Sequence, residues 1–258
     1  MTLYDPLAAW LAELARRAGR TPDEGAARRL GLYVESLLAA TTHGNLTALR
    51  DPQRLWTEGV GPSLALWPLL PSRGLAIDIG PGAGLPGLVL ACLEPQRPWL
   101  FIESRHKPAA FLSEMVATLG LSAQVVNQRA EQVGHGPKRQ QAAAATARAV
   151  GSLGLVAELA LPLLRHGGVL VSPRGDHPAD NDVLEQGLIE VLGGELRLVQ
   201  EPSLPGFVRR GRVALVEKRR PTPSAYPRTP PALGQGIRVV TGTPPAGGEQ
   251  RLKAQRGG

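Results

Sequence analysis

The sequence predicts a Rossmann-like α/β fold: a mainly parallel sheet with an antiparallel final strand, preceded by a group of helices. Two observations carry this prediction. From Leu75 onward, short apolar runs alternate with stretches of helical periodicity, a pattern typical of strand–helix–strand units. Before that point, apolar residues recur at helical spacing, as at Leu7, Trp10, Leu11 and Leu14. These helical faces are one-sided, so we expect the first helices to pack against the sheet domain.

Each expected element follows from its local pattern. Asp-Pro pairs at residues 5–6 and 51–52 and a capping box at residues 21–24 mark three helix starts. Apolar runs predict strands at residues 75–79, 99–103, 124–127, 169–172, 196–200 and 212–217, with helices at 86–93, 108–119, 153–164 and 179–192. Residues 142–147 are a poor strand former because they are alanine-rich, and only their place in the alternation predicts a strand. Residues 201–211 show no helical pattern, so we expect the last two strands to be antiparallel.

Composition divides the chain into three parts. We expect a helical segment at residues 1–72, a catalytic α/β domain at 73–218 and a tail at 219–258. The tail holds seven prolines, seven glycines and seven Lys/Arg against one acidic residue, Glu249, so it carries +6 of the formal net charge of +7. Such a segment buries too little apolar surface to offset its ordering entropy, and we expect it to be disordered. It is either a solvated tail without a binding function or an arm that contacts nucleic-acid phosphates.

Several classes of protein are excluded by what the sequence lacks. Cys92 is the only cysteine, which rules out an internal disulfide, and its apolar surroundings indicate a buried thiol. No apolar run reaches the length of a membrane span, and the first residues do not resemble a signal peptide. The five histidines lack metal-ligand spacing. We therefore expect a cytoplasmic monomer that binds neither membrane nor metal.

A glycine-rich loop follows the first predicted strand and opens a helix. Asp78 precedes Gly80, Gly82 and Gly84, and Glu103 ends the next strand about twenty residues later. Glycines at a helix start let a ligand approach backbone N–H groups, and a carboxylate at the second strand end suits ribose hydroxyls. NAD and S-adenosylmethionine both satisfy this pattern. A glycine turn used only for packing is the third interpretation.

Asp78 favours S-adenosylmethionine over NAD. An acid two residues before the first glycine gives the acidic-x-G-x-G-x-G form that methyltransferases use. Such an acid can face the amino group of a methionine moiety, whereas it would repel a pyrophosphate.

The same loop, DIGPGAGLPG, resembles the signature DVGTGAGLPG of the bacterial 16S rRNA guanine-N7 methyltransferase family RsmG, also called glucose-inhibited division protein B. The resemblance extends over roughly residues 30 to 230, in a series of short blocks that follow one another in the same order as in the family. These blocks are Asn45–Ala48, Arg50–Pro52, Ser63-Leu64, Glu103-Ser104 with Lys107 and Phe111-Leu112, Arg129–Glu131, Thr146–Val150, Gly167-Gly168, Arg174-Gly175 and Tyr226–Arg228.

The resemblance implies a class I methyltransferase sheet, S-adenosylmethionine as cofactor, and 16S rRNA or the small ribosomal subunit as partner. Together with the loop residues above, it assigns cofactor contacts to Asp78, Gly80, Gly82, Gly84, Leu85, Glu103, Ser104, Ala130, Glu131 and Arg148. It assigns RNA contacts to Lys107, Arg148, Arg174, Tyr226 and Arg228. Without the family resemblance, Lys107 and Arg148 would be interpreted as solvated surface charges. Tyr226 would fit a packed anchor of the tail as well as a platform on which a base stacks. No catalytic residue is predicted, because guanine N7 carries a lone pair and no proton.

This chain departs from the family pattern mainly on the side that would face RNA. Glu58, Gly59 and Pro62 stand where the family has Arg, His and Asp, Ala143 replaces an Asp, and Arg174 replaces a Lys. A methyltransferase acting on another RNA or a small molecule, a non-catalytic RNA-binding relative and an NAD oxidoreductase therefore stay open. Methylation assays on RNA and on metabolites distinguish an RNA methyltransferase from one that acts on a small molecule. A non-catalytic RNA-binding relative would bind S-adenosylmethionine weakly or not at all, and an oxidoreductase would bind a nicotinamide cofactor instead.

Overall fold

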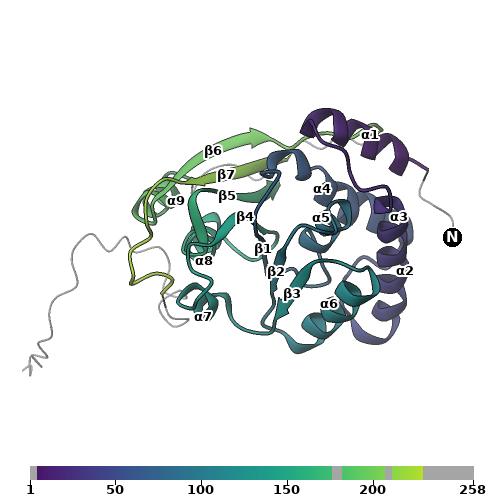
Figure 1. Cartoon of the computed structure of the whole chain (residues 1–258), viewed down its shortest axis with the longest axis horizontal. Helices are drawn as coiled ribbons and strands as arrows, with labels where there is room; N and C mark the ends of the chain where they lie inside the picture. Colours follow the sequence, from purple (N-terminus) through teal and green to yellow (C-terminus); the bar gives the residue numbers. More distant parts are fainter. Residues whose placement is uncertain (1–4, 176–181, 207–210, 229–258) are drawn as a thin grey trace, which may run out of the picture.

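The structure, a computed structural model, describes residues 5–175, 182–206 and 211–228 of the chain. In this part of the chain, one seven-stranded sheet has the order β3-β2-β1-β4-β5-β7-β6. The strands are β1 Ala76–Ile79, β2 Trp99–Ile102, β3 Ala123–Val126, β4 Ala142–Ala147, β5 Leu164–Gly175, β6 Gly194–Gln200 and β7 Arg212–Lys218. Figure 1 shows this sheet crossing the molecule between two groups of helices.

Strands β1 to β5 are parallel, and β7 runs antiparallel to both β5 and β6, which confirms the predicted fold and its antiparallel end. The order changes direction at β1, which pairs with β2 on one side and β4 on the other. Parallel sheets of this kind bind ligands at the carboxyl ends of the strands, next to such a switch point. The loops after β1, β2, β3 and β4 meet at that edge.

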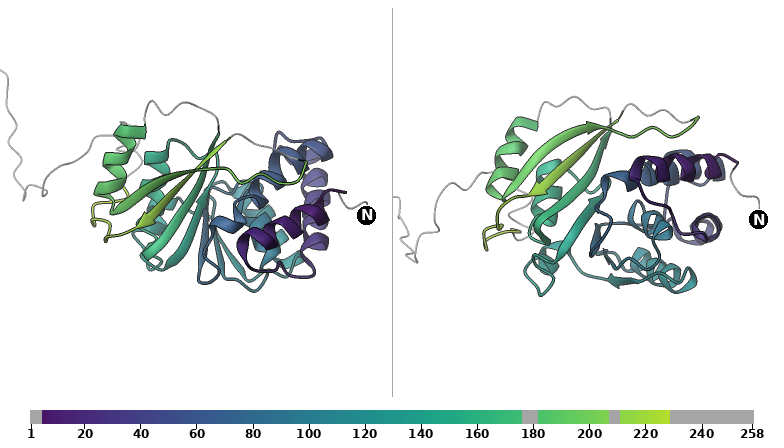
Figure 2. Two further views of the ribbon diagram at one scale, coloured as in Figure 1. Left: turned by 90° about the horizontal axis from the view of Figure 1, so that it is seen from above. Right: turned by 45° about the horizontal axis from the view of Figure 1, so that its top comes forward.

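Helices cover both faces of the sheet. One face carries α5 Gly87–Leu93 and α6 His106–Thr118, with the N-terminal helices packed outside them. The N-terminal elements are α1 Leu7–Ala18, α2 Ala26–Gly44, α3 Pro52–Arg54, the π-helix η1 Leu55–Val60, α4 Gly61–Leu64 and the 3₁₀ turn η2 Trp67–Leu69. The other face carries α7 Ala130–Gly134, α8 Leu153–Ala160 and α9 Asp182–Val191. Figure 2 shows the N-terminal helices on the far side of the sheet from α9.

Alternation along the strands divides the buried side chains between two cores. On β2, Trp99 and Phe101 face the core shared with the N-terminal helices, whereas Leu100 and Ile102 face α7 and α8. The first core joins Leu7, Trp10 and Tyr33 to residues of α5 and α6, so the N-terminal segment and the sheet bury one continuous apolar surface. The Trp10 indole also donates to the carbonyl of Pro205 (2.9 Å), which ties α1 to the loop after β6.

The alanine-rich run is strand β4, with each of its residues buried. It lies between β1 and β5 and is covered on both faces, so the small side chains let the helices approach closely and burial overrides strand propensity. The strands at 76–79 and 123–126 begin one residue away from their predicted starts.

Three predicted helix boundaries are wrong. At the Asp5-Pro6 start, α1 begins at Leu7 with Pro6 in the N-cap position and without a side-chain cap. The helix expected at 153–164 ends at Ala160, and β5 begins at Leu164, because Pro162 cannot donate the N–H that a continuing helix needs. The capping box at residues 21–24 does not form: α2 begins at Ala26 without a side-chain cap, and the Asp23 carboxylate accepts from the Gly25 N–H (2.9 Å) instead. By contrast, Asp51 caps α3 as predicted, through the Arg54 N–H (2.8 Å).

The segment expected as a tail begins with ten residues, 219–228, that the structure describes and that contact α7, α8 and α9. Residues 229–258, which hold the rest of that prediction, lie outside the described part. None of the helices in the described ranges is both long enough and apolar enough to cross a membrane.

Lys218, at the end of β7, gives a test of the packing between the sheet and the helices. Its side chain is 1% exposed and donates to the carbonyls of Leu161 (2.8 Å) and Leu192 (3.1 Å), at the ends of α8 and α9. Burial, and then repulsion by Arg139, lowers the pKa of Lys218 from 10.5 to about 8. Between these pH values the unfolded chain binds the proton that the folded chain has released, so raising the pH stabilises the fold.

We predict that the free energy of unfolding of the wild type, relative to Lys218→Met, increases on the order of 3 kcal/mol as the pH rises from 8 to 10.5. Urea unfolding of both proteins across that range measures the difference. Parallel pH profiles would show that the Lys218 ammonium is not destabilised by its surroundings.

Candidate functional site

The glycine loop, residues 80–87, is held against the sheet by Asp78 of β1. This carboxylate is fully buried: Oδ2 accepts the Gly87 N–H (2.6 Å), and Oδ1 accepts the Thr146 hydroxyl from β4 (2.9 Å). Burial raises the pKa of Asp78 to about 7, against the opposing effect of these two donors. Asp78 therefore fixes the start of α5, which begins at Gly87.

Gly87 is required by this close approach. A Cβ placed on it would lie 2.4 Å from Asp78 Oδ2, a contact that no side chain tolerates. The final glycine of the sequence pattern thus permits the hydrogen bond between loop and strand.

A second buried carboxylate holds the middle of the loop. Glu103, after β2, is 3% exposed, and its Oε2 accepts the Gly82 N–H (2.9 Å) while Oε1 accepts the Arg105 N–H (2.9 Å). Gly82 has a φ of +57°, a left-handed conformation that disfavours other residues. The two predicted acids, Asp78 and Glu103, therefore hold the same loop at two points, its end and its middle.

The N-terminal segment contributes two further contacts that the sequence did not indicate. The hydroxyl of Tyr33, on α2, donates to the carbonyl of Ala83 inside the loop (2.9 Å). Arg148, after β4, donates to the carbonyls of Glu58 (2.6 Å) and Gly59 (3.2 Å) in the π-helix. A π-helical turn within a helical segment is frequently found at a functional site. Both contacts join the helical segment to the rim of the sheet.

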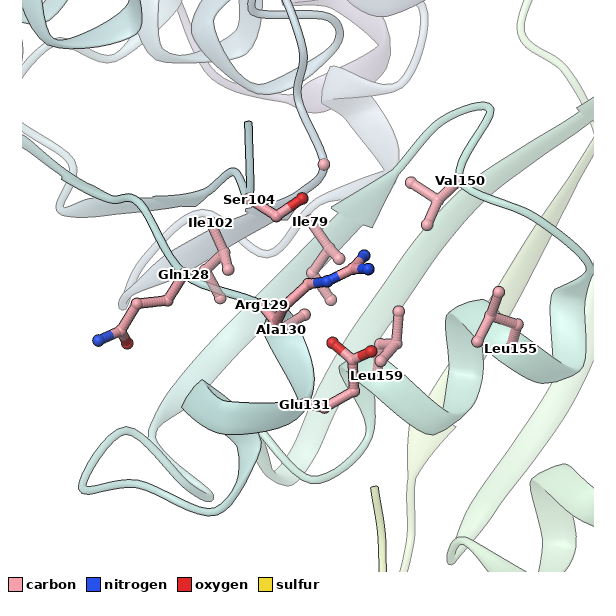
Figure 3. A pocket seen from close by; sticks show the side chains of 11 residues that line it. Ile79, Ile102, Ser104, Gln128, Arg129, Ala130, Glu131, Val150, Leu155 and Leu159 are labelled. Carbon is pink, nitrogen blue, oxygen red and sulfur yellow. The ribbon is translucent and has the colours of Figure 1, made fainter. Parts of the chain in front are cut away.

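The first pocket lies at the carboxyl ends of β1, β2 and β3 and has a volume of about 330 Å³ (Figure 3). Its apolar walls come from strand ends, the loop after β4 and α8: Ile79, Ile102, Val150, Leu155 and Leu159. Its polar or small lining residues are Gly80, Ser104, Gln128, Arg129, Ala130 and Glu131. Figure 3 shows the Arg129 guanidinium directed into the space between the strand ends and α8, with Gln128 pointing away. An apolar slot with a polar rim suits a flat heteroaromatic ring joined to a sugar.

The second pocket, of about 280 Å³, lies on the other side of the glycine loop. Gly80 lines both pockets, so they meet at the first glycine. The other lining residues come from the loop after α2, the glycine loop itself and two strand ends: Leu46, Thr47, Leu49, Pro81, Gly82, Ala83, Leu85, Arg105, Arg148 and Ala149.

A third pocket, of about 300 Å³, adjoins the second through Leu46 and Arg105. It is lined also by Asn45, His106, Lys107 and Pro108. Arg105, His106 and Lys107 are exposed there, at the start of α6. This edge of the site therefore presents basic groups to solvent.

Most predicted cofactor residues gather at this edge. Gly80, Ser104, Ala130 and Glu131 line the first pocket, and Gly80, Gly82, Leu85 and Arg148 line the second. Asp78, Gly84 and Glu103 lie behind the loop surface, where they are buried. Their assignment as direct ligands of the cofactor stays a prediction.

The predicted RNA contacts are spread over two regions. Lys107 lines the third pocket, and Arg174 donates to the carbonyl of Gly151 (3.2 Å) beside the loop after β4. Tyr226 is 4% exposed, and Arg228 forms an ion pair with the fully buried Glu158 of α8 (2.7 Å). These last two side chains are thus engaged inside the protein.

Sequence reasoning missed several lining residues. Gln128 was not predicted, although it follows β3 and the rule that ligands bind at strand ends could have found it. Arg129 belongs to the recognised block Arg129–Glu131 but was given no role. Leu46 and Thr47 belong to the block Asn45–Ala48, which resembles the family but was not assigned a function. Leu155 and Leu159 gave no such signal, because a helix with its apolar face towards the sheet shows the same pattern.

The departures from the family differ in their distance from the site. Gly59 borders the second pocket: a Cβ on it would lie 3.3 Å from the side chains of Leu49 and Leu85, which line that pocket. Ala143 lies near the amino end of β4, next to Gly74, and so at the opposite edge of the sheet. Among the described residues, no group of three or more His, Cys, Asp or Glu side chains is placed to hold a metal ion.

Comparison with known proteins gives one family. Residues 26–203 match the family described as rRNA small subunit methyltransferase G. The ribosomal RNA small subunit methyltransferase G of Roseiflexus castenholzii is 39% identical over 223 residues, which cover 84% of this chain and 94% of that protein. Those of Chloroflexus aggregans (38%, 76% and 83%) and Rubrobacter xylanophilus (41%, 74% and 76%) are similar to this chain to the same degree.

Solved structures share the fold at low sequence identity. An S-adenosyl-L-methionine-dependent methyltransferase from Methanococcus maripaludis has a TM-score of 0.50 and 13% identity, over 72% of this chain and 92% of that one. A branched-chain polyamine synthase variant from Thermus thermophilus, in complex with N4-aminopropylspermidine and 5′-methylthioadenosine, has a TM-score of 0.52 and 13% identity, over 74% and 65%. These two likenesses show a common architecture.

The buried Asp78 gives a test of the loop anchor. Its pKa is raised from 3.8 to about 7, so between these pH values the folded chain holds a proton that the unfolded chain has released. Raising the pH through this window therefore destabilises the fold. Asn at this position can still accept from Gly87 N–H and can donate to Thr146 Oγ1, without an ionisation.

We predict that the wild type loses stability relative to Asp78→Asn as the pH rises from 4 to 7, by an amount on the order of 4 kcal/mol. Thermal or urea unfolding of the two proteins across this range provides the measurement. A wild type that gained stability relative to the variant would show that the Asp78 carboxylate is stabilised, rather than destabilised, by burial.

Proposed function

This chain belongs to the rRNA small subunit methyltransferase G family, and on that premise we propose that it transfers a methyl group from S-adenosylmethionine to N7 of a guanosine in 16S rRNA. The observation that carries the proposal is the pair of pockets that meet at Gly80. One suits the adenosine of the cofactor, and the other suits an acceptor base.

The residues of the first pocket fit the adenosine moiety. Ile102 at the end of β2 and Ala130 at the start of α7 offer an apolar surface to an adenine ring. Ser104 supplies a hydroxyl at the rim, beside Glu103. Glu103 accepts hydrogen bonds from Gly82 and Arg105, and a carboxylate has about four acceptor positions, so it retains capacity for a ribose hydroxyl.

The methionine part of the cofactor extends along the glycine loop towards the second pocket. The loop offers a concave backbone surface there, formed by Gly80, Pro81 and Gly82. S-adenosylmethionine supplies an electrophilic methyl group on a positively charged sulfonium. Arg148 and Leu85 line the space in front of this part of the loop, where the acceptor base has to lie.

The protein has to position the acceptor rather than deprotonate it. Guanine N7 presents a lone pair in the plane of the ring, so attack on a methyl group requires no general base. Of the described residues that line the second pocket, none carries a carboxylate or an imidazole, which is consistent with this chemistry. Holding the two groups in near-attack geometry supplies up to about 7–11 kcal/mol of the barrier reduction in favourable cases.

The RNA approaches over the third pocket. Lys107, His106 and Arg105 are exposed there and lie next to the acceptor pocket, where phosphates that flank the target nucleotide would pass. Arg174, beside the loop after β4, extends the basic rim on the other side. The target base has to be unpaired or splayed out to enter the second pocket.

The activity is tested by incubating the protein with labelled S-adenosylmethionine and either small subunits or naked 16S rRNA that lack the modification. Digestion to nucleosides should release labelled 7-methylguanosine. We predict that Arg148→Met lowers the rate at least about 100-fold, because it releases the π-helix and one wall of the acceptor pocket. Arg165→Met is the matched control, since the exposed Arg165 lies at the opposite edge of the sheet on β5.

Three other results would contradict this proposal or part of it. Cofactor binding without labelled nucleoside on either RNA would indicate a different acceptor, and the Gly59 and Pro62 departures would be its first explanation. RNA binding without cofactor binding would indicate a non-catalytic relative. Equal loss in Arg148→Met and Arg165→Met would show that Arg148 has no specific role in the acceptor pocket.

A further inference from the structure

The chain after β7 crosses the two helices that form one side of the first pocket. We call residues 219–228 the C-terminal strap. Figure 1 shows it passing from the end of β7 down beside α8 towards α7. α7 provides Ala130 and Glu131 to the first pocket, and α8 provides Leu155 and Leu159. Contacts that hold α7 and α8 in place therefore also hold these lining residues in place.

The strap is attached to α8 by a buried ion pair. The Arg228 guanidinium donates to both oxygens of Glu158 (Nε to Oε1, 2.9 Å; Nη2 to Oε2, 2.7 Å), and the Arg228 backbone N–H donates to Oε1 (2.7 Å). Glu158 is fully buried and directly precedes Leu159. A carboxylate in this position needs its cation, because an uncompensated buried charge is strongly unfavourable. The bidentate geometry also fixes the direction of both side chains.

The strap is attached to α7 by a second set of bonds. The Arg139 guanidinium donates to the carbonyls of Thr222 (2.9 Å) and Tyr226 (2.8 Å) in the strap, and to that of Gly134 (2.8 Å) at the end of α7. His135 Nε2 lies 2.7 Å from the Pro227 carbonyl oxygen. Arg139 thus joins the strap and the last turn of α7 through one side chain.

Close packing leaves little freedom between these parts. A Cβ on Gly134 would lie 2.7 Å from Cγ of Pro227. The Tyr226 side chain is 4% exposed and belongs to the same core as Ala130, Val133 and Leu159. The strap therefore completes the core under the first pocket.

We propose that the C-terminal strap positions α7 and α8 for cofactor binding, with Arg228 and Glu158 as positioning residues of the S-adenosylmethionine site. The inference rests on the proposed function, because it assigns the first pocket to the adenosine of that cofactor. It replaces the expectation that Tyr226 and Arg228 contact RNA. Their side chains face the protein interior, and the Arg228 side chain is 16% exposed.

The test separates cofactor affinity from RNA affinity. We predict that Arg228→Met raises the dissociation constant for S-adenosylmethionine at least about tenfold, while the dissociation constant for naked 16S rRNA stays within twofold of the wild type. Calorimetric titration with S-adenosylmethionine and filter binding of the RNA measure the two constants, at a temperature well below the melting point of each variant. The reverse split, weaker RNA binding with unchanged cofactor binding, would overturn the proposal and restore an RNA contact.

Three variants control for loss of folding. Arg16→Met removes an exposed ion pair with Glu13 on α1, far from the strap, and should leave both constants unchanged. Glu158→Gln keeps an acceptor for the Arg228 N–H, and Arg228→Lys keeps the charge without the bidentate geometry. Both should show the same split with a smaller change, and they decide the outcome if Arg228→Met does not fold. If these folded variants bind the cofactor as the wild type does, the proposal is wrong, whereas a wild type that binds no S-adenosylmethionine contradicts the proposed function itself.

Discussion

The site depends on one constraint: two buried carboxylates hold a short glycine-rich loop between neighbouring strands. Asp78 fixes the end of the loop through the Gly87 N–H, and Glu103 fixes its middle through the Gly82 N–H. Because both acids are used inside the protein, the outer surface of the loop keeps a fixed shape. The two pockets that meet at Gly80 lie on either side of that surface. A methyl donor that lies along the loop would thus be oriented by a backbone surface that the protein itself holds fixed.

Both faces of the sheet reinforce this loop and its surroundings. On one face, α2 reaches the loop through Tyr33 and Ala83, and the π-helix accepts the Arg148 guanidinium. On the other face, the strap fixes α7 and α8 through Arg139 and Arg228. The N-terminal helices and the last described residues therefore contribute to the site although few of them line it. The segments before and after the α/β sheet thus contact the elements that form the site.

Much of the fold could be predicted because strand–helix alternation is local. The strands and the antiparallel end follow from apolar runs, and the glycine loop follows from its spacing. The alanine-rich β4 was predicted only from its position, since its burial between β1 and β5 is a property of the whole sheet. The bonds of Asp78 to Thr146 and of Arg228 to Glu158 join residues 68 and 70 positions apart, and no local pattern reports such pairs. For that reason the glycine loop and its two acids could be located from the sequence, whereas the internal contacts of Asp78 and Tyr226 became visible only in the structure.

The most direct test of this account is a crystal structure of the protein with S-adenosylhomocysteine. We predict adenine density in the first pocket, against Ile102 and Ala130, with the homocysteine following the glycine loop past Gly80 so that its sulfur faces the second pocket near Arg148. Asp78 and Glu103 should keep their bonds to the loop in the complex. Density for the adenine outside the first pocket, or a loop that breaks its bond between Asp78 and Gly87 to admit the ligand, would contradict it.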